Sequence, residues 1–366
     1  VPRTMHFHSS LTLDSSHAAY QKYIYNNFEW GVPENALKWK IMEPTKVSIQ
    51  IQVNNVLTLI VSCCLDCLIK VRGHNMFWDK GDYVPNWLHG MSSSQILQEM
   101  HKRVDGMILE HWDVNNENLH GHAFEDLTNH ADINAEMFKW MHAKDPNVKL
   151  FLNEYNVIAA GVSTTVYKSQ GKKLKDAGVP IYGMGVQGHF GSIVVYVLKY
   201  RLDKVAESGL PIWVTELTIK DSNENTKATA LEDLMTMFFS HPAVEGVLLW
   251  GFWDGAIWIK ESALATGPNI NLIKIKSFTC SPVFAMVAAC RSNNIPLQVT
   301  SGVICIDFSL ANQNRAWPIL GYTFGTSTNR VFPFDAKVYQ MYYNTSTRLL
   351  PVLCLYFYIL VDEIKA

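Results

Sequence analysis

Short apolar runs alternate with longer amphipathic segments through the middle of the chain. The short runs have the length and the β-branched or aromatic content of strands, whereas the longer segments carry apolar residues at helical spacing. This alternation is typical of β/α units around a parallel sheet, and we therefore predict an α/β fold. The runs predicted as strands are 70–78, 110–117, 149–156, 182–189, 211–217 and 246–254.

Helices are predicted between these strands, and one further β/α unit precedes them. The segments "NAEMFKWMHAKD" (134–145) and "TTVYKSQGKKLKDAG" (164–178) have helical periodicity. An earlier stretch, "NNFEWGVPENALKW" (26–39), adds a predicted strand.

Polar and aromatic side chains recur where the predicted strands end. The run at 110–117, for example, ends in Asn116 and Glu117, and the run at 211–217 leads to Glu216. In a closed parallel barrel all strands end on one face, where active sites of that architecture are assembled. We therefore expect these side chains to surround one cleft: Glu34, Asn35, His74, Glu117, Asn153, Tyr155, Gln187, His189, Glu216 and Trp250.

Composition limits what such a cleft can bind. The chain has 366 residues, of which 48% are hydrophobic and 17% charged, so it can bury the core of one barrel-sized domain or of two smaller ones. Its formal net charge of −2 gives no long-range positive field. We therefore expect no nucleic-acid partner.

Membrane insertion and metal binding are not predicted either. The longest apolar runs, 56–69 and 349–361, are too short to span a bilayer. Cys64 and Cys67 form a lone C-x-x-C without a second pair, and we interpret the cysteines as buried thiols. His6 and His8 alternate near the start, where an exposed strand or terminus explains them better than a metal site.

Cofactor motifs are similarly weak. "GMGVQG" matches the glycine spacing of dinucleotide sites, but it lacks the following helix start and the later acidic partner. No serine elbow of the form G-x-S-x-G occurs in the sequence. We expect neither a cofactor nor a metal.

Seven short motifs occur in an order that resembles one enzyme family. They are "PENALKW", "VRGHNMFW", "WDVNNE", "LNEYN", "GMGVQGH", "WVTEL" and "WGFWD", spread over 28–258. In this order they resemble glycoside hydrolase family 10, and together they look like a retaining endo-1,4-β-xylanase. The resemblance implies a TIM (β/α)8 barrel that hydrolyses internal β-1,4 bonds of xylan by double displacement.

The resemblance implies a catalytic pair of glutamates. Retaining hydrolysis needs one carboxylic acid that protonates the leaving oxygen and a carboxylate about 5 Å away that attacks the sugar carbon. By resemblance Glu117 is the acid/base, with Asn116 on the 2-hydroxyl of the attacked sugar and Gln187 orienting the carboxyl. Glu216 is the nucleophile, with His189 as its neighbour. The structural alternatives are a helix-capping Glu117 and a Glu216 paired with a structural histidine.

The resemblance also assigns residues to sugar binding. Hydroxyl-binding and apolar side chains would orient the sugar rings along the cleft. The alternatives are a solvated helix charge for Lys38 and core packing for the tryptophans, which is our interpretation of Trp30, Trp39, Trp112 and Trp140. The implied set is Glu34, Asn35, Lys38, His74 and Trp78 on the glycone side, Tyr155 on the aglycone side, and Trp250 and Trp258 at the scissile bond.

The sequence departs from the family pattern at several places. Thr218 stands where members carry the aspartate of an E-L-D motif that helps to hold the histidine, and threonine supplies no charge. The segment 47–69 occupies the position of a barrel helix but is rich in β-branched residues. The first strand is unrecognisable, and 5–16 is at most its remnant.

The C-terminal third is also atypical. We assign 1–267 to the barrel, with its N-terminal strand shortened, and 268–330 to an insertion of unknown fold. That insertion is either an added small domain or a mis-spliced segment. The final part, 331–366, is expected to contain the closing barrel helix, "FDAKVYQMYYN", followed by an atypical apolar tail.

Three functions remain open from the sequence. The first is an endo-1,4-β-xylanase, the second a catalytically impaired xylan- or glycan-binding relative, and the third a barrel glycosidase for another β-1,4-glycan. For the first we expect a secreted monomer whose partner is xylan or xylo-oligosaccharide. No secretory leader opens the chain, which favours a processed or truncated start. "NTS" at 344–346 is a potential glycosylation site.

Overall fold

The computed structural model divides the chain into two compact units, Val1–Lys276 and Ser277–Ala366. Within them the structure describes residues 3–7, 18–46, 70–105, 109–272, 297–300, 303–306, 336–345 and 348–357. Residues of the sequence analysis that fall outside these ranges include the segment 47–69 with Cys64 and Cys67, and His8.

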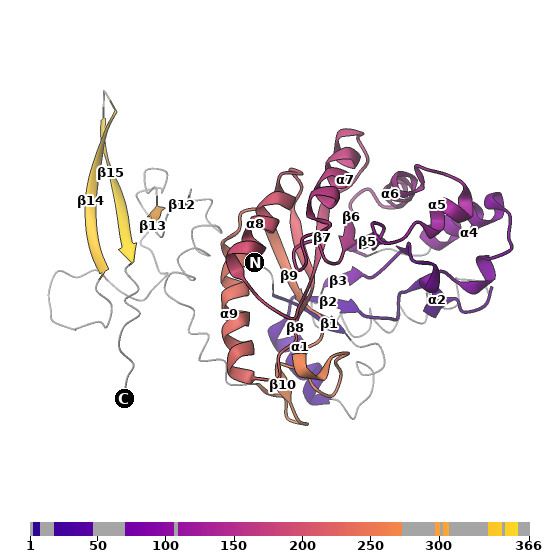
Figure 1. The fold of residues 1–366 in the computed structure, drawn as a ribbon, viewed down its shortest axis with the longest axis horizontal. Coiled ribbons are helices and arrows are strands. Elements are labelled where there is room, and N and C mark those ends of the chain that lie inside the picture. Colours follow the sequence, from indigo (N-terminus) through magenta and orange to yellow (C-terminus); the bar gives the residue numbers. More distant parts are fainter. Residues whose placement is uncertain are drawn as a thin grey trace. The chain divides into compact units, whose positions relative to one another are not determined.

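A closed parallel barrel forms the first unit (Figure 1). Every neighbouring pair of strands is parallel, and closure comes from β1 pairing with β9 and from β3 pairing with β5. The predicted TIM (β/α)8 fold is confirmed. The eight barrel strands are β1 (Arg3–Phe7), β2 (Trp30–Pro33), β3 (Lys70–Gly73), β5 (His111–Asn116), β6 (Lys149–Glu154), β7 (Gly183–Phe190), β8 (Ile212–Ile219) and β9 (Val244–Leu249).

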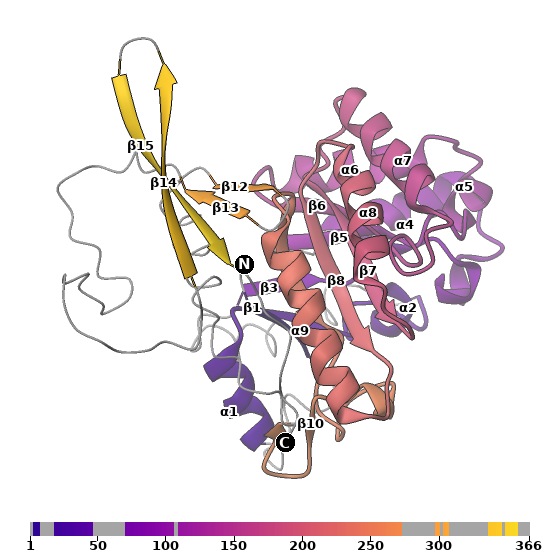
Figure 2. The ribbon, with the colours of Figure 1, turned by 60° about the vertical axis from the view of Figure 1, so that its left-hand side comes forward.

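Helices lie on the outside of the strands (Figure 2). The longest, α9, begins after Asn223, whose side chain accepts hydrogen bonds from the backbone N–H groups of Asn225 and Thr226. The predicted helices at 134–145 and 164–178 are confirmed as α6 and α7. The α-helices are α1 (Ala18–Asn27), α2 (Trp39–Met42), α4 (Ser93–Asp105), α5 (Ala123–Thr128), α6 (Ile133–Lys144), α7 (Thr164–Asp176), α8 (Val195–Ala206) and α9 (Glu224–Ser240).

Short elements complete this unit. The 3-10 turns η2 (Gly81–Tyr83), η3 (Asn86–Leu88) and η4 (Lys260–Ser262) lie in loops. Strands β10 (Ala265–Thr266) and β11 (Asn271–Leu272) form a small antiparallel pair.

Four of the six predicted strands match the observed bounds to within two residues, and the other two differ more. The run 70–78 is interrupted: β4 (Phe77–Trp78) resumes beside β5, after Met76 N–H has bonded to the Asp113 carbonyl. The run 246–254 is shifted, since β9 starts at Val244 and ends at Leu249. Gly251 then adopts a φ of 84°, a left-handed conformation that takes the chain out of the strand.

The first barrel strand is present at the start of the chain. In β1, Thr4 is in register with Trp30 of β2, and Met5 is in register with Leu249 of β9. Residues 5–7 of the expected remnant therefore belong to a strand that closes the barrel.

The second unit contains an antiparallel sheet in the order β12, β13, β15, β14. Its strands are β12 (Leu297–Thr300), β13 (Val303–Ile306), β14 (Ala336–Thr345) and β15 (Arg348–Phe357). The expected closing helix at 334–344 is wrong, because its described part is β14. Val338 and the aromatic Tyr339, Tyr342 and Tyr343 favour an extended chain, and β14 pairs with β15 along its whole length.

The barrel core is built from large aromatic side chains that fit against glycines. Trp30, Trp39 and Trp112 are buried as expected, and the partly buried Trp140 packs against the core. A Cβ built on Gly246 of β9 would lie 2.5 Å from Cε3 of Trp213. This contact leaves no room for a larger residue.

Neither a membrane-spanning helix nor a metal cluster is found in the described ranges. None of the helices there combines the length and the hydropathy needed to cross a bilayer. Groups of three or more His, Cys, Asp or Glu side chains suited to a metal are likewise absent from them.

Replacing Gly246 by alanine should destabilise the barrel. The new methyl group would overlap the Trp213 ring, and overpacking of this kind lowers the free energy of unfolding by about 1–3 kcal/mol. Gly81→Ala is the matched control, because nothing lies within 4 Å of a Cβ at that position. Urea unfolding of the three proteins measures the difference. Equal stabilities for Gly246→Ala and Gly81→Ala would contradict this packing.

Candidate active site

Glu117 lies directly after β5 in an unusual backbone conformation. Its φ is 57°, in the left-handed region that few residues other than glycine adopt. Its N–H donates to the Asn153 carbonyl of β6 at 2.9 Å. This conformation turns the chain at the strand end, where the Glu117 carboxyl contacts residues from β4 and β7.

Three side chains surround the buried Glu117 carboxyl. Oε1 accepts a hydrogen bond from Gln187 Nε2 at 3.2 Å, and Oε2 accepts one from Trp78 Nε1 at 3.1 Å. Lys80 Nζ lies 3.5 Å from the same Oε2. Both oxygens are therefore oriented, and the helix-capping interpretation of Glu117 has no hydrogen bond to support it among the contacts described.

Glu216, on β8, has a different set of partners. Its Oε1 accepts a hydrogen bond from Asn153 Nδ2 at 2.8 Å, and its Oε2 accepts one from His189 Nε2 at 3.2 Å. His74 Nδ1 lies 4.0 Å from Oε1. Burial alone would raise the pKa of Glu216, but the hydrogen bonds from His189 and Asn153 and the charges of both histidines lower it below its ordinary value.

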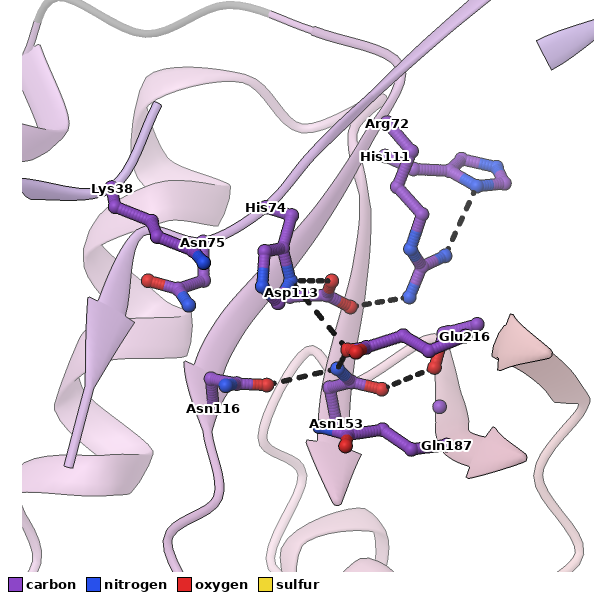
Figure 3. A network of polar contacts seen from close by, with 12 residues as sticks. Lys38, Arg72, His74, Asn75, His111, Asp113, Asn116, Asn153, Gln187 and Glu216 are labelled. Carbon is purple, nitrogen blue, oxygen red and sulfur yellow. Dashed lines mark hydrogen bonds and ion pairs between the residues drawn. The ribbon is translucent and has the colours of Figure 1, made fainter. Parts of the chain in front are cut away.

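Figure 3 shows the polar network around the Glu216 carboxyl, in which His74, Asn153 and Asn116 take part. Gln187, which donates to Glu117, is the register partner of Glu216 on the neighbouring strand. Asn153 Nδ2 donates to Asn116 Oδ1 at 2.8 Å as well as to Glu216. Although Glu117 and Glu216 are 99 residues apart in the sequence, Asn153 links them in the fold, because its backbone carbonyl accepts from Glu117 N–H and its side chain donates to Glu216.

A buried ion pair contacts this network. Arg72 Nη2 donates to Asp113 Oδ1 at 2.5 Å, and Asp113 Oδ2 accepts from His74 Nδ1 at 3.0 Å. Burial would raise the pKa of Asp113, but the Arg72 charge and the His74 hydrogen bond lower it. Burial and the Arg72 charge lower the pKa of His111 to about 2, so this imidazole is neutral beside the guanidinium. His74 therefore lies between two carboxylates, Asp113 and Glu216.

Three of the five residues expected on the glycone side, Asn35, Lys38 and Trp78, line a cavity of about 100 Å³, whereas Glu34 and His74 are not among its lining residues. Lys38 Nζ donates to Asn35 Oδ1 at 2.8 Å. Burial lowers the pKa of Lys38, although the charges of Glu216, Glu34 and Glu117 oppose this shift. Lys38 is therefore a buried cation facing carboxylates, and its interpretation as a solvated helix charge is wrong.

Four aromatic candidates lie in different surroundings. Trp78 stacks on Tyr83 with ring centroids 3.5 Å apart, so one of its faces is covered. Trp250 is buried with its ring 5.0 Å from His74, whereas Trp258 is 53% exposed beside His189. Tyr155 stacks on the ring of His120 at 3.9 Å.

Thr218 is buried next to His189 in the sheet. The two residues are register partners on β8 and β7. Neither Thr218 Oγ1 nor His189 Nδ1 has a hydrogen-bond partner among the described residues. The imidazole that contacts Glu216 thus has no acceptor on its second nitrogen there.

Sequence reasoning missed five charged or titratable residues of this region. Four of them lie inside or beside the quoted motifs, and the available signal was a charged or titratable group within a run of buried strand residues. Among them, the fully buried Glu154 has a pKa that burial raises to about 7, against hydrogen bonds from Leu119, His120 and Tyr155. The five are Arg72, Lys80, His111, Asp113 and Glu154.

Removing Asn153 should raise the pKa of Glu216. Asn153→Ala deletes a hydrogen bond to the ionised carboxylate while the carboxyl stays buried, so it will protonate at higher pH. Asn147→Ala, an exposed position just before the same strand, is the control. A ¹³C NMR titration of protein with labelled glutamate side chains reads the pKa. An unchanged value in Asn153→Ala would show that this hydrogen bond does not hold Glu216 ionised.

Two known proteins are similar in sequence to most of this chain. An endo-1,4-β-xylanase 2 of Arabidopsis thaliana is 37% identical over 238 residues, which cover 63% of this chain and 22% of that protein. The anti-sigma-I factor RsgI6 of Acetivibrio thermocellus is 35% identical over 69% of this chain and 33% of its own length. The chain thus spans between a fifth and a third of these relatives.

A solved structure shows the same architecture. The intracellular xylanase of Thermoanaerobacterium saccharolyticum, in complex with xylotetraose, superposes with a TM-score of 0.64 at 26% identity. The superposition covers 73% of this chain and 93% of the xylanase. The model of glycosyl hydrolase family 10 matches residues 4–288, most of the chain. The chain belongs to glycosyl hydrolase family 10.

Proposed function

We propose that the barrel unit is a retaining endo-1,4-β-xylanase, with Glu216 as the nucleophile and Glu117 as the acid/base. The observation that carries this proposal is the pair of buried glutamates, linked through Asn153, whose carboxyl groups have unlike surroundings. Glu216 is held ionised by histidines and an amide, while Glu117 is oriented by Trp78 and Gln187. The names of the Arabidopsis and Thermoanaerobacterium relatives support xylan as the substrate.

In the first step, an oxygen of Glu216 bonds to the anomeric carbon while the bond from that carbon to the leaving oxygen breaks. Glu117 transfers its proton to the leaving oxygen, and a covalent glycosyl-enzyme forms. In the second step, Glu117 takes a proton from water, whose oxygen attacks the anomeric carbon and releases Glu216. The lowered pKa of Glu216 suits the nucleophile, because a carboxylate must be ionised to attack.

Neighbouring polar groups would orient the substrate. Asn116, fixed by Asn153, is positioned beside Glu117 to bind the 2-hydroxyl of the attacked sugar. Glu34, Asn35, Lys38 and His74 would bind hydroxyls on the glycone side. Each of them is buried or partly buried at the strand-end face.

Aromatic residues would complete the cleft. Trp78 supports Glu117 through its indole N–H and contacts Tyr83, so we assign it to orientation of the carboxyl as well as to the glycone side. Tyr155 would contact the aglycone. Trp250 and Trp258 would bound the scissile bond, with the exposed Trp258 open to a sugar face.

A second candidate function is glycan binding without turnover. Thr218 Oγ1 and His189 Nδ1, which lack a hydrogen-bond partner among the described residues, favour it, because an imidazole held through one nitrogen alone supports the nucleophile poorly. One relative also carries the name of a regulatory factor rather than of a hydrolase. A third candidate, hydrolysis of another β-1,4-glycan, is distinguished by comparing polymers.

We also propose that the protein acts outside the cell as a monomer. Polymeric xylan is a cell-wall glycan that lies outside the producing cell, which supports this proposal, whereas the relative from Thermoanaerobacterium saccharolyticum is named an intracellular xylanase. Fractionation of the producing organism and light scattering of the purified chain test the two statements. Retention inside the cell, or a stable dimer, would contradict them.

Release of reducing ends from xylan is the primary test, with β-glucan and mannan in parallel. The chain should release them fastest from xylan, and Glu216→Ala should lower the rate by roughly 10³-fold or more because it removes the nucleophile. Folded protein that binds xylan without releasing reducing ends would support the glycan-binding alternative. Faster release from β-glucan or mannan would support the third.

Glu117→Ala should show a different pattern. Xylan cleavage should fall by about 10²–10⁴-fold, because proton donation to the leaving oxygen is lost. Release of dinitrophenolate from an aryl β-xylobioside should fall far less, since this leaving group departs without a proton. Pre-steady-state absorbance measures the first step directly. Equal losses on both substrates would argue against the acid/base role.

Thr218→Asp should increase activity on xylan. A carboxylate at this position would give His189 Nδ1 an acceptor and fix the imidazole against Glu216. The expected gain in kcat/KM is several-fold, and Thr218→Val serves as a control of similar size without charge. A loss of activity in Thr218→Asp would show that the site is adapted to threonine.

A further inference from the structure

Glu154, the last residue of β6, is a buried carboxyl with no place in the proposed reaction. Side chains alternate between the two faces of a strand, so Glu154 points away from the side that carries Asn153 and its contact with Glu216. Its exposed fraction is 0%. Burying a carboxyl group costs free energy of folding unless its oxygens accept hydrogen bonds, and Glu154 has such partners.

Those partners come from two different loops. Oε2 accepts a hydrogen bond from the backbone N–H of Leu119 at 2.8 Å, in the turn that follows Glu117. Oε1 accepts from His120 Nδ1 at 2.8 Å and from the backbone N–H of Tyr155 at 2.9 Å. One carboxyl therefore ties the turn after β5 to the turn after β6.

The first of these turns fixes the conformation of Glu117. His120 N–H donates to the Glu117 carbonyl at 3.0 Å, which closes the turn around the left-handed Glu117. Because Glu154 bonds to Leu119 and His120, the second and third residues after Glu117, it restrains the backbone from which the Glu117 carboxyl projects. Glu154 touches neither Glu117 oxygen in the contacts described, so any effect on Glu117 is indirect.

The same hydrogen bonds build an aromatic pair. The His120 and Tyr155 rings stack with centroids 3.9 Å apart and an angle of 26° between their planes. Lys80 Nζ lies 5.4 Å from the Tyr155 ring centroid and 3.5 Å from Glu117 Oε2. The pair therefore lies near the Glu117 carboxyl, because the Lys80 ammonium is close to both the Tyr155 ring and Glu117 Oε2.

We propose that Glu154 is a positioning residue that aligns Glu117 with the leaving oxygen and holds the His120–Tyr155 pair as a platform for the departing sugar. This inference rests on the proposed function, because it assumes that Glu117 is the proton donor. It predicts a specific defect. Loss of Glu154 should impair departure of poor leaving groups more than departure of groups that need no proton.

The test compares Glu154→Gln with the parent chain on three substrates. Dinitrophenyl β-xylobioside needs no proton, phenyl β-xylobioside needs one, and xylotetraose needs a proton and a sugar platform. The glutamine amide has one acceptor oxygen instead of two, so at least one of the three donors loses its partner. The expected result is at least a tenfold greater loss of kcat/KM on xylotetraose and phenyl xylobioside than on dinitrophenyl xylobioside.

Glu245→Gln is the matched control. Glu245 is a partly buried carboxylate that, like Glu154, accepts hydrogen bonds, here from Tyr182 and Trp213, and it lies in β9 near the opposite ends of the strands. Its substitution should leave the dependence on the leaving group unchanged. Equal losses on all three substrates in Glu154→Gln would mean a merely structural role and would overturn the proposal.

His120→Ala keeps the proposal testable if Glu154→Gln does not fold. This variant removes one ring of the pair and leaves both backbone donors to Glu154 in place. It should raise KM for xylotetraose several-fold with a smaller change for dinitrophenyl xylobioside, and equal changes would overturn the platform. If the parent chain cleaves dinitrophenyl xylobioside but the two variants show none of these differences from it, the inference alone is refuted. If the parent chain is inactive on all three substrates, the proposed function is refuted.

Discussion

The ionised carboxylate of Glu216, buried at the end of β8, is the constraint on which the rest of the site depends. Burial disfavours its charge, so the fold has to supply donors around it. Asn153 and His189 donate hydrogen bonds to it directly. His74, which is hydrogen-bonded to Asp113, adds an electrostatic interaction that lowers the pKa of Glu216. The Arg72 guanidinium balances Asp113 within the barrel. The barrel interior therefore contains a series of paired charges, Arg72, Asp113 and His74, that ends at Glu216.

Closure of the barrel makes this arrangement possible. The donors and the acceptors come from β3, β5, β6, β7 and β8, and only parallel strands in a closed sheet deliver all their ends to one face. Two positions use backbone geometry in addition: the left-handed Glu117 turns its carboxyl toward Gln187 and Trp78, and the glycines that face large tryptophans let the interior fill. The closed barrel therefore determines both where the residues of the candidate site lie and how the core packs.

Much of the fold and of the candidate site could be predicted from the sequence, since apolar periodicity marks strands and helices wherever burial is regular. The residues around Glu117 and Glu216 could be predicted from the sequence motifs. The motifs give the positions of these residues in the chain but not their contacts. Contacts between distant residues were not accessible: nothing local shows that Trp78 is covered by Tyr83, that Arg72 pairs with Asp113, or that Glu154 bridges two loops. The expected helix at 334–344 failed because its aromatic and β-branched residues suit a strand that has a partner.

The stereochemistry of the first product tests the central claim most directly. Double displacement through Glu216 inverts the anomeric centre twice, so hydrolysis of a β-linked xylo-oligosaccharide must release the β-anomer. Proton NMR during the first minutes of the reaction, before mutarotation, distinguishes the two anomers of the new reducing end. The account predicts that the β-anomer signal rises first and that the α-anomer follows at the rate of mutarotation. Initial appearance of the α-anomer would contradict the account, because it requires a single displacement by water.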